Sequence, residues 1–197
     1  MTTMDAGFRR TVRTVALLNL GYFGVEFAVA QSIGSVSLFA DSVDFLEDAA
    51  VNFLIFAAMG WTMRRRAKVG MALSAILLVP ALALVWTLWQ KFQVPLPPAP
   101  LPLTVTGLGA LLINLFCAFL LVRYRHHSGS LSKTAFLSAR NDALANVAII
   151  GAGLITAFVW RSIWPDVIVG VAIAFMNMDA AREVWTAARD EHREATA

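Results

Sequence analysis

The stretch FADSVDFLEDAAVNFL, residues Phe39–Leu54, places four carboxylates in an otherwise apolar run. They are Asp41, Asp44, Glu47 and Asp48. A charged side chain near the centre of a bilayer costs about 2.5–3.5 kcal/mol on insertion scales. An acid kept at such a place needs a cation or a proton to offset that cost. The stretch therefore predicts a polar, functional face inside a membrane domain.

The composition of the whole chain is that of an integral membrane protein. Hydrophobic residues make up 58% of the chain and charged residues only 15%, with a mean hydropathy of +0.67. A soluble domain has about a quarter of its residues charged. The single Cys117 lies in an apolar run and has no partner for a disulfide or a metal motif. We predict an all-α membrane protein, with a six-helix transmembrane domain over 1–181 and a short charged cytoplasmic tail over 182–197.

Six stretches are long and apolar enough to be membrane spans, each needing about 20 residues. They are 14–33, 37–61, 69–90, 103–123, 135–159 and 163–180. The first is interpreted as an uncleaved helix rather than a signal peptide, because Asn19 and Glu26 interrupt its apolar run. The third loop, Gln93–Leu103, is rich in proline, which predicts a stiff extended linker that cannot be helical.

The basic residues predict the direction of these spans. Most of the 16 Lys and Arg residues precede the first span, follow the second, join the fourth to the fifth, or follow the sixth. Only Lys91 and Arg161 fall on the opposite side. The positive-inside rule then places both termini in the cytoplasm. The net charge of +3 is therefore a signal of topology, and we expect no nucleic-acid partner.

Helical geometry gathers the acids of the second span on one face. Residues four apart in a helix differ in direction by only about 40°. Asp41, Asp44, Asp48 and Asn52 therefore form one polar stripe, with Glu47 on its flank. We expect this stripe to face the interior of the bundle or a wet cavity rather than lipid.

The fifth span repeats the arrangement. Ser138, Asp142 and Asn146 follow one another at intervals of four residues. The segments Asp48–Asn52 and Asp142–Asn146 both read D-A-x-x-N. Two helices with the same polar spacing suit a site built between them.

The first, second and fifth spans together hold six acids and very little positive charge. The first span contains Glu26 and the fifth contains Asp142, in addition to the four acids of the second. Arg140 is the one basic residue within these spans. Pairing inside the protein cannot neutralise six acids, so the missing charge must come from outside, as a proton or a metal cation.

Two of these motifs resemble the cation diffusion facilitator family of divalent-metal transporters. Gly34–Asp48, GSVSLFADSVDFLED, is similar to the family's second-span signature, in which His or Asp is followed four residues later by a metal-binding Asp. That pair is Asp44 and Asp48 here. Lys133–Asp142, KTAFLSARND, is similar to the fifth-span signature. Asn19 also matches a polar position of the family's first span, as does Glu26.

The resemblance implies a metal site made of Asp44, Asp48 and Asp142, with Ser138 as a weak fourth ligand or Asn141 in its place. The family usually has His where this chain has Ser138. An all-oxygen site suits Mn²⁺ and Mg²⁺, whereas zinc more often takes His and Cys. We expect no prosthetic group and a transported cation among Zn²⁺, Mn²⁺, Co²⁺, Fe²⁺ and Cd²⁺. Candidates for the pathway or for proton coupling are Asp41, Glu47, Asn141, Asn146, Glu26 and Asn19.

The implied function is secondary transport of a divalent cation, with efflux by proton antiport. The expected partners are the lipid bilayer, divalent cations and protons. The expected assembly is a homodimer in the inner membrane of a bacterium. Family members usually end in a cytoplasmic metal-binding domain, but only 180–197 follow Asp179 here. We expect the regulation that this domain provides to be missing or to be supplied by another protein.

Three other functions stay open at this stage. The lost fifth-span His and the missing cytoplasmic domain also fit a non-transporting partner or regulatory subunit of a complete transporter. A passive channel is a further alternative. Intramembrane proteolysis by paired aspartates is disfavoured, because Asp142 lacks the flanking glycine expected of such enzymes.

Local features allow further interpretations. Asp166 after Pro165 predicts a cap at the start of the sixth helix. Asn19 and Glu26 either line the pathway or hydrogen-bond a neighbouring helix. Arg140 either extends to the membrane surface or neutralises an acid of the empty site. His126 and His127 either capture incoming metal or form a solvated loop pair.

Overall fold

The computed structural model describes residues 3–58, 82–124 and 130–176, without the side chains of 3–5, 58 and 130–140. All regular structure in these ranges is helical. The long helices are α1 (Thr3–Ile33), α2 (Val36–Ala58), α4 (Pro100–Val122) and α5 (Ser130–Phe158). Two shorter helical segments are described at 82–93 and Trp164–Met176. The predictions for His126 and His127 and for the tail 182–197 lie outside the described residues.

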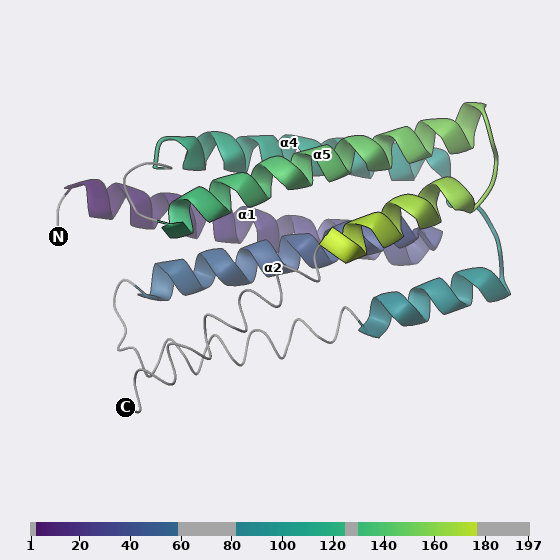
Figure 1. The fold of residues 1–197 in the computed structure, drawn as a ribbon, viewed down its shortest axis with the longest axis horizontal. Coiled ribbons are helices and arrows are strands. Elements are labelled where there is room, and N and C mark those ends of the chain that lie inside the picture. Colours follow the sequence, from purple (N-terminus) through teal and green to yellow (C-terminus); the bar gives the residue numbers. More distant parts are fainter. Residues whose placement is uncertain (1–2, 59–81, 125–129, 177–197) are drawn as a thin grey trace.

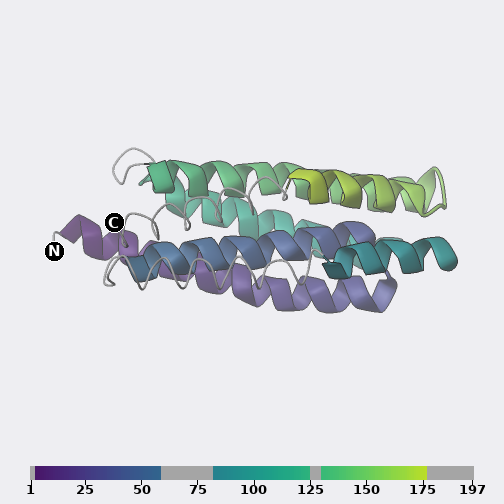
Figure 2. The same ribbon diagram turned by 60° about the horizontal axis from the view of Figure 1, so that its bottom comes forward.

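The four long helices run side by side as a bundle (Figure 1). Helix α1 packs on α2 and α4, and α5 packs on α4 and α2. The segments 82–93 and Trp164–Met176 lie beside the first half of α2, where Val36, Ile163 and Val167 form a buried apolar cluster. Both segments lie toward the end of the bundle that holds the connections 34–35, 94–99 and 159–163, called here the turn end (Figure 2).

Three described helices are long and apolar enough to cross a membrane. They are Ala6–Ile33, Pro100–Val122 and Asn141–Phe158. Helix α2 has 23 residues but is too rich in acids to meet the same criterion. Most of the predicted span 69–90 lies outside the described residues. The all-α membrane fold is thus supported, whereas the count of six spans and the side of the termini stay predictions.

Helix α1 extends well beyond the predicted span 14–33. It has 31 residues and begins at Thr3. At about 1.5 Å per residue it is roughly 46 Å long, whereas the hydrocarbon core of a bilayer is about 30 Å thick. The basic first turns, with Arg9, Arg10 and Arg13, therefore fit outside the hydrocarbon as part of the same helix.

The prediction that all of Gln93–Leu103 is non-helical is wrong at both ends, because Gln93 still belongs to the helical segment 82–93. Helix α4 begins at Pro100, after an extended Ala99 with φ −64° and ψ 117°. The first N–H groups of a helix have no partner within it, so a proline in the first turn loses no hydrogen bond. The first hydrogen bond at the start of α4 is the one that Leu103 N donates to Ala99 O over 3.2 Å. The extended linker is limited to 94–99.

A tight turn joins α1 to α2. Gly34 has φ +60°, in the left-handed region that glycine adopts without strain. Ser35 N donates to Ala30 O over 3.0 Å and closes the end of α1. Lys91, from the neighbouring segment 82–93, is buried and donates its Nζ to Gly34 O over 2.5 Å. The ammonium thus ties the segment 82–93 to the turn.

The predicted cap role of Asp166 at the start of its own helix is wrong, because its carboxylate caps α2 instead. Oδ1 accepts from Ser35 Oγ at 2.6 Å and from Ser37 Oγ at 2.6 Å and N at 3.1 Å. Oδ2 accepts from Val36 N at 2.8 Å. The first N–H groups of α2 are free and carry partial positive charge, so a carboxylate is favoured there. The sequence could not show this, because the contact joins residues 130 positions apart.

A close approach of two backbones brings Asp166 within reach. Gly170 lies one turn after Asp166, and a Cβ there would lie 2.8 Å from Ser37 N and from Val36 C. Only glycine allows the segment Trp164–Met176 to lie this close to α2. We call Asp166, Gly170, Ser35 and Ser37 the α2 clamp.

Replacing Asp166 by Ala should destabilise the protein markedly. It removes the acceptor of four hydrogen bonds and leaves buried donors unpaired, a loss on the order of 3 kcal/mol. Ser162→Ala is the control, since the bond that Ser162 Oγ accepts from Trp164 N is exposed and 3.4 Å long. The apparent Tm in detergent should fall by several degrees for Asp166→Ala only. Equal Tm values for the two variants would contradict the role of the α2 clamp.

Candidate functional site

The acids of α2 face into the bundle, as the stripe predicted. Asp41 is fully buried and Glu47 is 8% exposed. Asp44 and Asp48 are half-buried. Every residue of 35–43 is buried, and partial exposure begins at Asp44. The acid face is therefore closed toward the turn end and accessible only from Asp44 onward.

Helix α5 brings Asp142 to this face. Asp142 is half-buried, and α5 packs against α2. The negative charge of Asp142 acts on Asp44, so the two carboxylates lie within electrostatic range across the two helices. Asn141 is exposed, unlike its neighbour. The side chains of Ser138 and Arg140 lie outside the described part.

The acids do not form a ready metal cage. Within 3–58, 82–124 and 130–176, no three Asp, Glu, His or Cys side chains are spaced to hold a metal ion. Carboxylates that share a face repel one another when charged. A divalent cation held by acids of both helices would therefore require their side chains to move together.

A chain of hydrogen bonds from α4 and α1 reaches Asp48. Cys117 Sγ donates to Asn19 Oδ1 over 3.7 Å, and Asn19 Nδ2 donates to Asp48 Oδ2 over 3.4 Å. Asn19 is fully buried. Of the two interpretations of Asn19, the bond to a neighbouring helix is confirmed, and that bond ends on a candidate ligand. The part played by Cys117 had no signal in the sequence, because its partner lies on another helix.

Glu26 of α1 and Asp41 of α2 form a second acidic pair. Both are fully buried, and none of their four carboxylate oxygens accepts a hydrogen bond from a donor in the described part of the chain, so the bond open to them is a proton shared between the two carboxyls. The charge of Asp41 acts on Glu26. Tyr22, one turn before Glu26, donates its hydroxyl to Thr106 O of α4 over 2.6 Å. A buried carboxyl without a partner is far cheaper when protonated, so this pair suits the storage of protons.

The two copies of D-A-x-x-N have the same local geometry. Asn52 Nδ2 donates to Asp48 O over 2.8 Å, and Asn146 Nδ2 donates to Asp142 O over 2.7 Å. Each amide therefore lies against the backbone one turn before it. The repeat seen in the sequence is also a repeat in structure.

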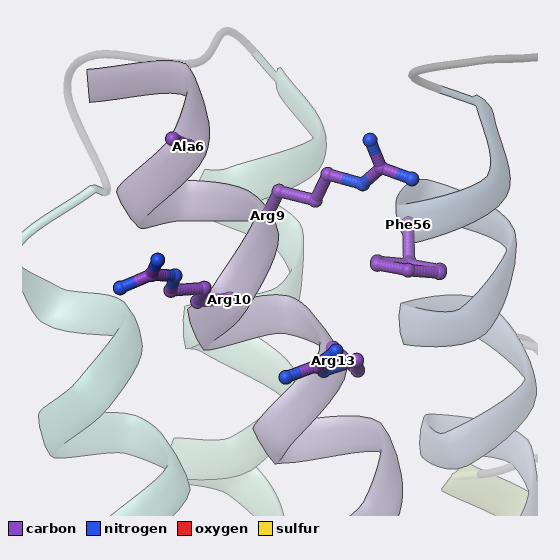
Figure 3. A pocket seen from close by; sticks show the side chains of 5 residues that line it. All are labelled: Ala6, Arg9, Arg10, Arg13 and Phe56. Carbon is purple, nitrogen blue, oxygen red and sulfur yellow. The ribbon is translucent and has the colours of Figure 1, made fainter. Parts of the chain in front are cut away.

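A basic pocket of about 250 Å³ lies at the opposite end of α1 from the turn end, lined by Ala6, Arg9, Arg10, Arg13 and Phe56. The Arg9 guanidinium lies 4.8 Å from the centre of the Phe56 ring. Figure 3 shows Arg9 extending from α1 toward Phe56, while Arg10 and Arg13 point away from it. This lining repels divalent cations, so the pocket is separate from the carboxylate face.

Comparison with known proteins gives a family and several relatives. The chain matches the family described as "Cation efflux transmembrane domain" over residues 12–190. It is 23% identical over 210 residues to the "Zinc transporter ZitB" of Yersinia pseudotuberculosis serotype I (strain IP32953), covering 98% of this chain and 64% of that protein. The "Zinc transporter ZitB" of Pectobacterium atrosepticum is 25% identical over 186 residues, which cover 85% of this chain and 57% of that protein.

The family match includes the acid face of α2, the Asp142 region of α5 and the α2 clamp. The chain spans just under two thirds of the length of the curated relatives it matches. Since the family match covers most of the chain, the chain belongs to the cation efflux family, the cation diffusion facilitators, which is a family of transporters and not of enzymes.

Proposed function

We propose that this protein transports a divalent metal cation through a site formed by Asp44, Asp48 and Asp142, with Ser138 as a fourth ligand. The observation that carries the proposal is the packing of α5 on α2, with Asp44 and Asp142 both half-buried on these two helices. A divalent cation between the two helices offsets the repulsion between these carboxylates. The bond from Asn19 restrains the Asp48 carboxylate from the side of α1.

The cation exchanges with protons. In the empty state the clustered acids hold protons, and an arriving cation displaces them. Glu26 and Asp41 serve as the proton store, since both are buried and no donor in the described ranges reaches their oxygens. Glu47 and Asn146 line the pathway beside them. Release of the cation on one side and of protons on the other couples the two fluxes through alternating access.

Zinc is the first cation to test, and export is the direction to test first. The relatives are named zinc transporters. The proposed ligands are all oxygens, however, a set that also suits Mn²⁺. We further propose six spans with both termini in the cytoplasm, a homodimer, and residence in a bacterial inner membrane.

A second candidate function is a non-transporting partner of a complete transporter. Two observations favour it. No three potential ligands in the described residues are spaced for a metal ion, and Ser138 stands where the family usually has His.

Asp48→Ala and Asp142→Ala should each abolish transport, because each removes a charged ligand while the helices remain packed. Purified protein in liposomes with an imposed pH gradient is supplied separately with Zn²⁺, Mn²⁺, Co²⁺, Fe²⁺ and Cd²⁺. Gradient-driven uptake of at least one ion is expected for the wild type and not for either variant. Thr14→Ala, at an exposed position of α1, is the control and should retain uptake.

The same assay can also exclude transport by this chain alone. Folded wild-type protein that takes up none of the five ions would exclude the stand-alone transporter. Reconstitution with a complete transporter would then show whether this chain changes the activity of a partner.

Glu26→Gln and Asp41→Asn should separate metal binding from proton coupling. Each variant removes one site that can gain or lose a proton, but leaves Asp44, Asp48 and Asp142 intact. Calorimetry should show metal binding close to that of the wild type. A pH-sensitive dye inside the liposomes should report fewer protons moved per cation. An unchanged proton count in both variants would remove the pair from the coupling mechanism.

A further inference from the structure

Two buried amide oxygens on the site helices accept no hydrogen bond within the described part of the chain. Asn52 is 2% exposed and Asn146 is fully buried. Each uses its Nδ2 to donate to the backbone, yet neither Oδ1 accepts a hydrogen bond from the described part of the chain. Buried acceptors are nearly always paired in native proteins. Two such oxygens in two copies of one motif therefore call for a ligand.

The two oxygens lie on opposite sides of the carboxylates. Helices α2 and α5 run in opposite directions and pack together (Figure 1). Asn52 lies one turn, about 6 Å, from Asp48 away from the turn end. Asn146 lies one turn from Asp142 toward the turn end. A cation that crosses the bundle by way of the carboxylates would meet one amide oxygen before them and the other after them.

The chemistry of an amide oxygen suits a transient contact. It is a hard neutral ligand, of the kind that coordinates Ca²⁺ and similar cations. Without a formal charge it holds a divalent cation less tightly than a carboxylate does, so the cation can leave it. Conduction through successive sites needs binding that is favourable on entry and weak enough for exit.

We propose that Asn52 Oδ1 and Asn146 Oδ1 form two cation-contact sites, one on each side of the carboxylate site, which receive the divalent cation as it enters or leaves. This inference rests on the proposed transport function. The hydrogen bond from each Nδ2 to the carbonyl one turn earlier fixes the amide plane, so each oxygen is held in place before the cation arrives.

The chain itself suggests variants that separate the oxygen from this bond. Thr156 Oγ1 donates to Ala152 O over 2.8 Å, and Thr87 Oγ1 donates to Ala83 O over 2.9 Å. Threonine therefore makes the same backward bond in these helices without an amide oxygen. Asn52→Thr and Asn146→Thr keep the bond and remove the proposed ligand.

The experiment measures the initial rate of Zn²⁺ and Mn²⁺ uptake in liposomes, together with Tm and calorimetric binding in detergent. Each Asn→Thr variant should raise KM by about tenfold, the effect of one lost charge–dipole contact, with a Tm near that of the wild type. Asn52→Asp should lower both KM and kcat, because a carboxylate holds the cation longer. Thr156→Val is the matched control, which removes a buried backward bond of α5 and should leave KM unchanged.

Each result has one reading. Asn→Thr variants with a lowered Tm but the wild-type KM would show that the two oxygens bind only water. That result would overturn the inference and leave the proposed transport function intact. Wild-type protein that binds and transports neither cation would overturn the inference and the transport function together. A KM change in Thr156→Val as large as in the Asn variants would assign the effect to helix packing and also overturn the inference.

Discussion

The position of the acid face depends on one carboxylate, Asp166, at the start of α2. Its four hydrogen bonds fix the first residues of the helix, and Gly170 lets the two backbones approach to van der Waals contact. Helix α2 continues without a break from Val36 to Ala58. Fixing its start therefore sets both the height and the rotation of Asp44 and Asp48. Asp166 therefore positions the proposed metal site although it is not one of the proposed ligands.

The fold was predictable where the signal is local. Apolar length and helical period predicted the helices, and the polar stripe predicted which face of α2 is buried. The failures concern contacts between distant residues or the chemistry of helix ends. Pro100 begins α4 because the first turn needs no N–H donor, and Asp166 reaches across to another helix. The acids of α2 keep this 23-residue helix below the hydropathy criterion for a span, although its length would suffice.

The same division applies to the site. Spacing alone gathered Asp41, Asp44 and Asp48 on one face, and the D-A-x-x-N motif correctly paired the local geometry of Asn52 with that of Asn146. The repeated polar spacing of the fifth span pointed to Asp142, the family resemblance made it a ligand, and α5 does pack on α2. No pattern in the sequence could show that Cys117 orients Asn19, which in turn reaches Asp48, because these three residues lie on three helices.

The unbroken length of α1 has a mechanical consequence. Asn19 lies near the middle of this 31-residue rod and is joined to α2 through Asp48. Because α1 has no break between Arg9 and Ile33, the basic pocket, the bond to Asp48 and the turn at Gly34 are joined by one continuous helix. A displacement of this helix along its axis at one of these three places is therefore transmitted to the other two.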